Sequence, residues 1–524
     1  MLVPPSPEKR REAGEGERSQ ARGGGAALPK RDDFRLAPTQ PARSAPRPSP
    51  RLFWGRDRRG TSQGEGPRRV GNALDLWFVG DLISIFEGFV LNIRTIRSAP
   101  PFAELREMAA AASTDDPALR DAVAAIVGDV AARGDAALLE YTSRFDGFDA
   151  GSAAGLRIPA EALARAAASI DPDLLVSLRR AAENVRRFHE RQREHGFVDW
   201  LPDGSLLGQR ITPLRRVGIY VPGGRAAYPS SVLMNAIPAA VAGVDEIAMV
   251  SPTPGGETSP VVLAAAHVAG VTEVLRIGGA QAVAALAHGT GTIGRVDKVV
   301  GPGNKWVAEA KRQVFGLVDI DMIAGPSEIL VIADEWADPV HVAADLIGQA
   351  EHDPDAIAWL VTPCATLAEA VPAEIERLLA RNPRRDVARA ALEANGAIVI
   401  VPSLLDAAAV ADLRAPEHLE LLVAEPLALA GRICNAGAIF LGAHSPEPMG
   451  DYFAGPNHVL PTGGTARFAS PLGVYDFVKR TSLIGYSPER LRAHADDVIR
   501  LAESEGLHGH AEAVRVRLRG GAGE

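Results

Sequence analysis

Short apolar runs alternate with longer Ala-rich stretches from about residue 213 onward. The short runs are apolar at successive positions, as in strands that are buried on both faces, and the Ala-rich stretches between them have helical spacing. The expected strands are 217–221, 246–251, 272–277, 298–300, 329–333, 356–361 and 397–401, and the expected helices are 231–242, 261–269, 280–288 and 338–351. This alternation predicts an α/β fold with two doubly wound, Rossmann-like domains built on parallel sheets.

The regions on either side of this alternation have other patterns and predict other structures. Residues 95–200 carry Ala, Leu and Arg at helical spacing, and residues 482–524 follow the last strand-like run as a helical tail. We therefore expect small helical segments on the N- and C-terminal sides of the α/β region. Residues 1–70 are dense in Pro, Gly, Arg and Ser without an apolar period, so we expect a disordered basic extension that ends near residue 88.

An apolar run at 74–93 has the length of a membrane span. It contains Asp75, Asp81 and Glu87, each of which would cost about 2.5–3.5 kcal/mol at the centre of a bilayer. The run also begins too far from the first residue for a secretory signal and has no small-residue cleavage site. We expect neither a membrane span nor export.

Charge and cysteine content narrow the class of protein further. The net charge of the 524 residues is −9, and residues 1–70 hold 16 Lys and Arg against 8 Asp and Glu, which leaves −17 for the remainder. An acidic body argues against nucleic acid as the main partner. The two cysteines, Cys364 and Cys434, are too few for a disulfide framework, so we expect a cytoplasmic protein and interpret both as small core residues.

Residue types that bind metals and transfer protons gather in the later part of the α/β region, from residue 349 onward. Gln349 and His352 are three residues apart on the helix expected from Asp338, so both side chains can leave one face and reach one ion. More His and carboxylate residues follow at 415–419, 450–452 and 457–461, beside Gly or Pro rather than inside apolar runs. This grouping predicts a site rather than scattered surface histidines.

A second group of polar residues suits a cofactor. Tyr220, Gln281 and Asn304 follow expected strands, beside Gly residues, and a doubly wound sheet binds ligands at the carboxyl ends of its strands. The chain has no Gly-x-Gly-x-x-Gly fingerprint, and residues 301–305 lack the Walker spacing. Glycines with a purely structural role in loops are therefore the alternative for each of these motifs.

Eight motifs, taken in chain order, make the sequence similar to the histidinol dehydrogenase family over roughly residues 92–515. They are Gly218-Ile-Tyr-Val-Pro-Gly-Gly224, Gly278-Gly-Ala-Gln-Ala282, Gly301-Pro-Gly-Asn304, Gly325-Pro-Ser-Glu328, Gln349-Ala-Glu-His352, Pro416-Glu-His-Leu419, Gly450-Asp-Tyr452 and Asn457-His-Val-Leu-Pro461. The resemblance implies a homodimer that uses zinc and two NAD to oxidise L-histidinol through L-histidinal to L-histidine, the last steps of histidine biosynthesis.

The resemblance also implies roles for individual residues. The zinc ligands would be Gln349, His352, Asp451 and His510, with His508 as the alternative to His510. The catalytic acid and base would be Glu417 and His418, because a neutral imidazole suits the hydroxyl proton near pH 7 and a carboxylate can activate the water that the second oxidation needs. Substrate contacts would be Ser327, Gln349, His352, His418, Asp451, His458, Glu505 and His510, and NAD contacts would be Tyr220, Gln281 and Asn304.

On this basis the chain is expected to have five parts. They are a disordered extension (1–88), the helical start of a substrate and zinc domain (89–215), an NAD-binding α/β domain (216–328), the second part of the substrate and zinc domain (329–470) and a helical tail that completes the partner's site (471–524). Ala415 stands where the family commonly has Gly, and the extension has no family counterpart.

Two other readings remain. A zinc-dependent hydrolase could use the same histidines, Asp and Glu to polarise water, although the chain lacks His-Glu-x-x-His and carries cofactor-type loops. A non-enzymatic protein that binds nucleic acid through the basic arm would show strongly salt-dependent binding.

Overall fold

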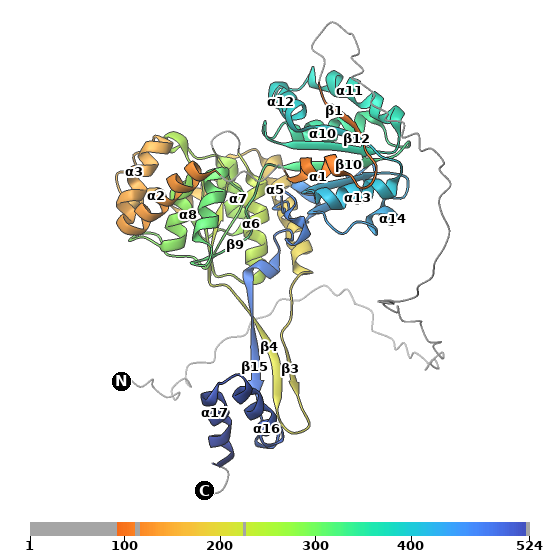
Figure 1. The fold of residues 1–524 in the computed structure, drawn as a ribbon. Coiled ribbons are helices and arrows are strands. Elements are labelled where there is room, and N and C mark those ends of the chain that lie inside the picture. Colours follow the sequence, from red (N-terminus) through yellow and green to blue (C-terminus); the bar gives the residue numbers. More distant parts are fainter. Residues whose placement is uncertain (1–91, 111–115, 224–226, 520–524) are drawn as a thin grey trace, which may run out of the picture. The chain divides into compact units, whose positions relative to one another are not determined.

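The computed structural model describes residues 92–110, 116–223 and 227–519, which form three sheets and the helices around them (Figure 1). The expected disordered extension, 1–88, and almost all of the apolar run at 74–93 lie outside the described residues. Within the described ranges, no helix combines the length and the apolar character needed to cross a membrane.

The first sheet is doubly wound and holds the strands that start the α/β region. Its order is β2-β7-β6-β5-β8-β9, and all pairs are parallel except β2 with β7. The strands are β2 (Arg157–Ile158), β5 (Arg216–Tyr220), β6 (Glu246–Val250), β7 (Glu273–Leu275), β8 (Lys298–Val300) and β9 (Asp319–Ile320). The order reverses between β5 and β8, which makes that point the expected ligand crevice.

Helices cover both faces of the first sheet, and each face has its own buried apolar core. One face carries α4 (Ala160–Ser169), α5 (Pro172–Glu190), α6 (Pro229–Ala242) and α7 (Pro260–Ala269), and the other carries α2 (Pro117–Arg133), α3 (Asp135–Asp146), α8 (Gly279–His288) and α9 (Lys305–Val314). Several helices start at a capping side chain: Asp171 accepts from Leu174 N at 2.9 Å, followed by Pro172, which suits a first helical position.

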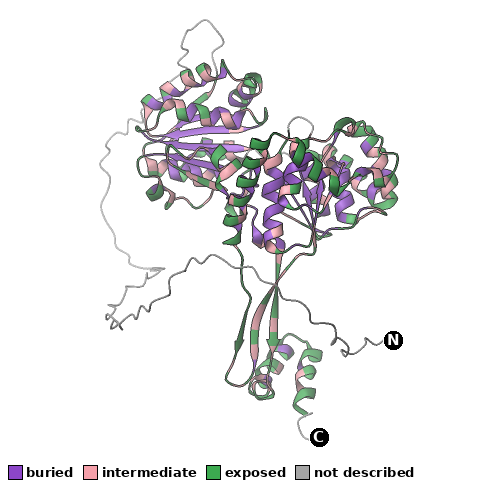
Figure 2. Cartoon of the chain, turned by 180° about the vertical axis from the view of Figure 1, so that it is seen from behind, coloured by how far each residue is buried: buried purple, intermediate pink, exposed green. Residues whose placement is uncertain are grey.

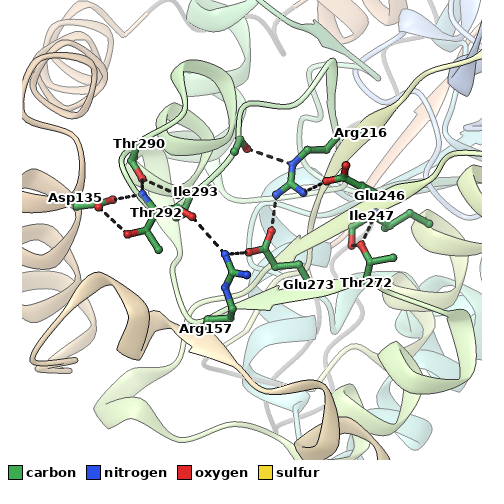
Figure 3. Close-up of polar contacts among 11 residues, drawn as sticks. Asp135, Arg157, Arg216, Glu246, Ile247, Thr272, Glu273, Thr290, Thr292 and Ile293 are labelled. Carbon is green, nitrogen blue, oxygen red and sulfur yellow. Dashed lines mark hydrogen bonds and ion pairs between the residues drawn. The ribbon is translucent and has the colours of Figure 1, made fainter. Parts of the chain in front are cut away.

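The amino ends of the central strands are tied together by charge (Figure 3). Arg216, the first residue of β5, pairs with Glu246 at 2.5 Å and also with Glu273, which are the first residues of β6 and β7. Arg157 of β2 adds a 2.5 Å ion pair to Glu273. This network fixes the strand register at the end of the sheet opposite Tyr220, so it leaves the carboxyl ends free for a ligand.

The second sheet is entirely parallel, in the order β1-β12-β11-β10-β13-β14. Its strands are β1 (Arg94–Arg97), β10 (Glu328–Ala333), β11 (Ile357–Thr362), β12 (Ala397–Ile400), β13 (His418–Leu422) and β14 (Ala438–Leu441). The helices α10 (Pro339–Ala350), α11 (Ala365–Leu379) and α12 (Arg385–Asn395) share one core, and α1 (Ala103–Ala110), α13 (Leu404–Arg414) and α14 (Pro426–Ala430) pack on the other face. The prediction of an α/β fold with two doubly wound parallel sheets is confirmed.

The segment 89–215 is divided between the two sheets. β1 and α1 join the second sheet and its helices, through the β1–β12 pairing and the contact of α1 with α13. The helices α2, α4 and α5 instead pack on α6, α7, α8 and α9 of the first sheet.

A third, antiparallel sheet was not predicted. It contains β3 (Phe197–Trp200), β4 (Leu206–Pro213) and β15 (Val478–Gly485), in the order β15-β4-β3. The expectation of mostly helical structure at 95–200 is therefore wrong for its end, and the helical tail begins later than residue 482. Figure 2 shows why the pattern misled: these strands are exposed or half-buried, so they lack the apolar face that marks a strand in sequence.

Two helices close the described chain. α16 (Pro488–Ser504) and α17 (His508–Arg519) pack on each other. Arg490 of α16 pairs with Asp203 at 3.0 Å, and the Ser487 N–H donates to Ser205 Oγ at 2.9 Å, so the pair of helices is anchored to the turn between β3 and β4.

Candidate active site

Several predicted residues meet at the amino ends of two adjacent strands. β10 and β13 pair with Ile329 opposite His418, which places Ser327 and Glu417, the residues just before or at these strand starts, at one edge of the second sheet. α10 runs back to the same edge and ends with Gln349 in its last turn. His352 lies two residues beyond the end of α10 rather than on it, and its N–H donates to Gln349 O at 3.2 Å.

His418 is the buried centre of this group. Its Nδ1 lies 3.1 Å from Gln349 Oε1 and 3.2 Å from Glu328 O, and both atoms are acceptors. Nδ1 therefore carries the proton in the neutral ring, and the lone pair is on Nε2. Nε2 has no hydrogen-bond partner among the described residues and lies 3.6 Å from Asp451 Oδ1.

Buried carboxylates surround the imidazole and shift several pKa values. Burial alone would lower the pKa of His418, but the charges of Glu447, Glu417 and Asp451 outweigh it and raise that pKa well above its ordinary value. Burial raises the pKa of Glu417 to about 8 and that of Glu447 to about 7. Burial alone would raise the pKa of Asp451, but the nearby His418 and His458 outweigh it and lower that pKa.

Glu447 is a site residue that the sequence reading missed. It begins the short helix α15 (Glu447–Met449), is 4% exposed, and its Oε1 lies 3.8 Å from His418 Nδ1. α15 leads into a π-helical turn (Gly450–Ala454) that carries Asp451. Its spacing of four residues before Asp451 was the one available signal.

The side chains at this edge fit a divalent cation. His418, Glu447 and Asp451 offer ligand atoms that all lie within 4.8 Å of one another. The buried Gln349 brings its amide oxygen Oε1 to the same place, 3.1 Å from His418 Nδ1, and burial lowers the pKa of His352, which keeps that imidazole neutral and able to coordinate. Imidazole nitrogen with carboxylate and amide oxygen is a donor set that suits Zn²⁺.

A cavity of about 600 Å³, here called the main cavity, joins this edge to the first sheet. Among the predicted residues it is lined by Tyr220, Asn304, Ser327, Gln349, His352, Glu417, His418, Asp451 and His458. The first two come from the carboxyl ends of β5 and β8, as expected for a dinucleotide. The others come from the amino end of the second sheet and the loops beside it. Doubly wound sheets usually bind ligands at the opposite end, where the carboxyl ends of the strands lie.

A smaller cavity of about 450 Å³, here called the side cavity, lies next to the main one and shares Tyr220, Gly223, Pro252 and Asn304 with it. Gln281 lines only the side cavity, from the first turn of α8 rather than from a loop. The Tyr220 hydroxyl accepts from the Gly279 N–H at 3.0 Å, and Asn304 caps α9 through the N–H groups of Trp306 and Val307.

Three predicted residues lie elsewhere. Glu505, His508 and His510 are exposed, at the end of α16 and on α17, and line neither cavity. The interpretation of both cysteines as core residues is wrong for Cys434, which is exposed, whereas Cys364 is half-buried beside the core under α11. Neither cysteine lines either cavity.

Comparison with known proteins agrees with this arrangement. A family model described as histidinol dehydrogenase matches residues 109–518. A histidinol dehydrogenase of Geobacillus kaustophilus is 56% identical over 403 residues, 77% of this chain and 94% of that protein, and one of Chromobacterium violaceum is 55% identical over 425 residues, 81% of this chain and 98% of that protein. The crystal structure of histidinol dehydrogenase from Elizabethkingia anophelis superposes with a TM-score of 0.78 at 33% identity, covering 82% of this chain and 99% of that one. The chain therefore belongs to the histidinol dehydrogenase family and is an oxidoreductase.

Proposed function

We propose that this oxidoreductase oxidises L-histidinol through L-histidinal to L-histidine, with zinc and two NAD, in the cytoplasm. The observation that carries the proposal is the main cavity, in which Tyr220 and Asn304 from the first sheet face the same space as His418 and Asp451 from the second. A dinucleotide bound at one wall can then present its nicotinamide to a substrate held at the other.

The binding of NAD is assigned to the end of the first sheet. Tyr220, Gln281 and Asn304 line the side cavity, and the residues shared by the two cavities give a bound dinucleotide a continuous path into the main cavity. The length of NAD suits such a path, because its two nucleotides bind across the point where the strand order reverses.

The zinc ion is assigned to Gln349, His352 and Asp451 of one subunit and to His510 of the other. When bound, zinc supplies a Lewis acid that anchors the nitrogen atoms of the substrate and offsets the charge of the surrounding carboxylates. Ser327 and His458 line the same cavity and suit contacts to the substrate. His458 is held in place because its Nδ1 donates to Asp451 O at 3.0 Å.

The proton transfers are assigned to His418, the first residue of β13, and to Glu417, the residue before it. In the first oxidation, His418 in its neutral form takes the hydroxyl proton of the alcohol at Nε2 while the hydride passes from the carbinol carbon to NAD. Bound zinc would favour this neutral form, because it would offset the carboxylate charges that raise the pKa of His418. In the second, Glu417 in its ionised form, which predominates above its pKa of about 8, takes a proton from water as it adds to the aldehyde, and the resulting hydrate gives its hydride to a second NAD. Each oxidation then produces one NADH. The first yields the aldehyde, and the second yields the carboxylate.

A homodimer explains the position of the C-terminal tail. The third sheet and α16 expose large apolar side chains, among them Phe197 at 54%, Trp200 and Ile484 at 72% and Leu501 at 65%. Apolar surface of this kind favours a protein partner. Since Glu505 and His510 line neither cavity of their own chain, we assign both to the site of the partner subunit, as two-fold symmetry allows.

The test is an initial-rate assay at 340 nm with zinc-loaded protein, NAD and L-histidinol. The proposal predicts NADH formation that requires L-histidinol and is lost in His418→Asn. Hydrolysis of ester or amide substrates without any NAD reduction would instead favour the zinc-dependent hydrolase, a reading to which the family membership lends no support.

A further inference from the structure

Asp146 is a half-buried acidic group that the proposed reaction does not use. It is the last residue of α3, before the left-handed Gly147, and it lines the side cavity together with Tyr220, Gln281 and Asn304. Its Oδ2 is buried and has no hydrogen-bond partner among the described residues. A carboxylate in that state lacks the donors that usually offset its loss of hydration.

Asp146 forms no ion pair within the part of the chain that the structure describes. The neighbouring Arg144 places its guanidinium over the Phe145 ring, 5.1 Å from the centroid. Burial raises the pKa of the Asp146 carboxyl, and Asp146 in turn helps to raise the pKa of the Tyr220 hydroxyl. The carboxyl group thus lines the side cavity while its buried Oδ2 lacks a donor.

The lining of the two cavities decides which half of a dinucleotide reaches Asp146. The nicotinamide must enter the main cavity, because the proton-transfer groups are there. Asp146 lines only the side cavity, as do Ile126, Phe145 and Trp306. Trp306 is 37% exposed, so its ring offers a surface on which a purine can stack. The side cavity therefore suits the adenosine half.

We propose that Asp146 accepts hydrogen bonds from the ribose hydroxyls of the adenosine half of NAD and thereby makes the site select NAD over NADP. A carboxylate accepts from two neighbouring hydroxyls, as acidic residues do in other dinucleotide sites. In NADP a phosphate replaces the 2′-hydroxyl, which removes a donor and sets two anions against each other. This inference rests on the proposed use of NAD and adds the residue that reads the ribose.

Binding can be measured without turnover, by titrating the zinc-loaded dimer in a calorimeter with NAD, NADP and 2′-deoxy-NAD. Wild type should bind NAD about 10- to 100-fold more tightly than 2′-deoxy-NAD or NADP, the range for a hydrogen bond to a charged group. In Asp146→Asn the affinity for NAD should fall about tenfold, and most of the discrimination against NADP and 2′-deoxy-NAD should disappear.

Asp149→Asn is the matched control, because Asp149 carries the same charge three residues later, is exposed and does not line either cavity. It should keep the wild-type ratios. If wild type binds NAD and 2′-deoxy-NAD with equal affinity, the inference is overturned, whether or not the Asp146 variant folds. It is also overturned if a folded Asp146→Asn protein keeps the wild-type ratio of affinities for NAD and NADP. If wild-type protein binds no dinucleotide at all, the proposed function fails too. This outcome therefore distinguishes failure of the proposed function from failure of the inference about Asp146 alone.

Discussion

The backbone N–H of Glu328 donates a 2.9 Å hydrogen bond to Oε2 of Glu417, which is 89 residues further along the chain. The carbonyl of the same residue faces His418 Nδ1 at 3.2 Å, so one backbone unit at the start of β10 orients both proposed proton-transfer groups. The Glu328 side chain is buried in an ion pair with Arg414 and accepts from the Gly463 N–H at 2.8 Å. This anchoring holds the two proposed catalytic side chains at a fixed spacing.

Replacing Glu417 by Gln should impair the second oxidation more than the first. The amide can still accept the Glu328 N–H bond, but it cannot take a proton from water. Oxidation of L-histidinal should fall by a factor on the order of 10² to 10⁴, the usual contribution of a general base. Separate steady-state assays with L-histidinol and L-histidinal measure the two steps, and an equal loss in both would remove the proposed role of Glu417.

Glu420 should make the folded state less stable as pH rises. Burial, with Asp345 beside it, raises the pKa of Glu420 to about 9 from 4.5, so the folded protein keeps a proton that the unfolded chain releases from about pH 4.5 upward. Glu420→Gln does not titrate, and its Oε1 can still accept from the Glu447 N–H. Its stability relative to wild type should therefore increase by about 2 kcal/mol between pH 5 and pH 7.

Urea unfolding of metal-free protein at pH 5, 6 and 7 checks this. Glu425→Gln removes an exposed carboxylate five residues away and should give a curve parallel to wild type. If Glu420→Gln also ran parallel to wild type, Glu420 would not retain its proton in the fold.

Ala415→Gly should stabilise the protein slightly. Ala415 follows α13 with a φ of 50°, a left-handed conformation that costs a residue with a Cβ about 1–2 kcal/mol. Gly removes that strain but costs about 0.5–1 kcal/mol of chain entropy, so the net gain should be about 1 kcal/mol or less. Ala409→Gly, at an exposed position inside the same helix, should lose about 1 kcal/mol. If the thermal midpoints of both variants moved in the same direction, the proposed backbone strain at Ala415 would be contradicted.

The sequence predicted the parts of the fold whose pattern is local. The strand expected at 298–300 matches β8 at both ends, and the helix expected from Asp338 starts with that residue as its cap. These elements are buried on defined faces, so apolar spacing reveals them. The strands β3 and β15 are stabilised by pairing with β4, and β15 lies more than 260 residues beyond it, a partnership that no local window contains.

Site residues that belong to a sequence motif could be predicted, whereas those that only tertiary packing brings to the site could not. Tyr220, Asn304 and His418 belong to recognisable motifs and line the main cavity. Glu447 and Asp146 belong to none, and their significance depends on what the fold brings beside them: His418 at 3.8 Å from Glu447, and a cavity beside Asp146. The spacing of Gln349 and His352 predicted that both side chains reach one ion from one helix face. Both line the main cavity, although α10 ends between them.

Two inactive variants should restore each other if the tail completes the partner's site. His510→Asn and Asp451→Asn should each be nearly inactive. After the two are unfolded and refolded together in equal amounts, half of the dimers would be mixed, and each mixed dimer would hold one intact site of two. Roughly a quarter of wild-type activity should return. If refolded wild type recovers and mixed dimers form but the mixture stays inactive, His510 acts within its own chain.

The most direct measurement of the proposed reaction is the amount of NADH formed from a limiting amount of L-histidinol. Zinc-loaded protein with excess NAD should convert each L-histidinol into one L-histidine with two NADH, counted at 340 nm and by chromatography of the product. His418→Asn should give almost none, and 2′-deoxy-NAD should give the same final yield at a lower rate when it is not saturating. One NADH per L-histidinol with L-histidinal as the end product, or no NADH at all, would contradict the four-electron oxidation.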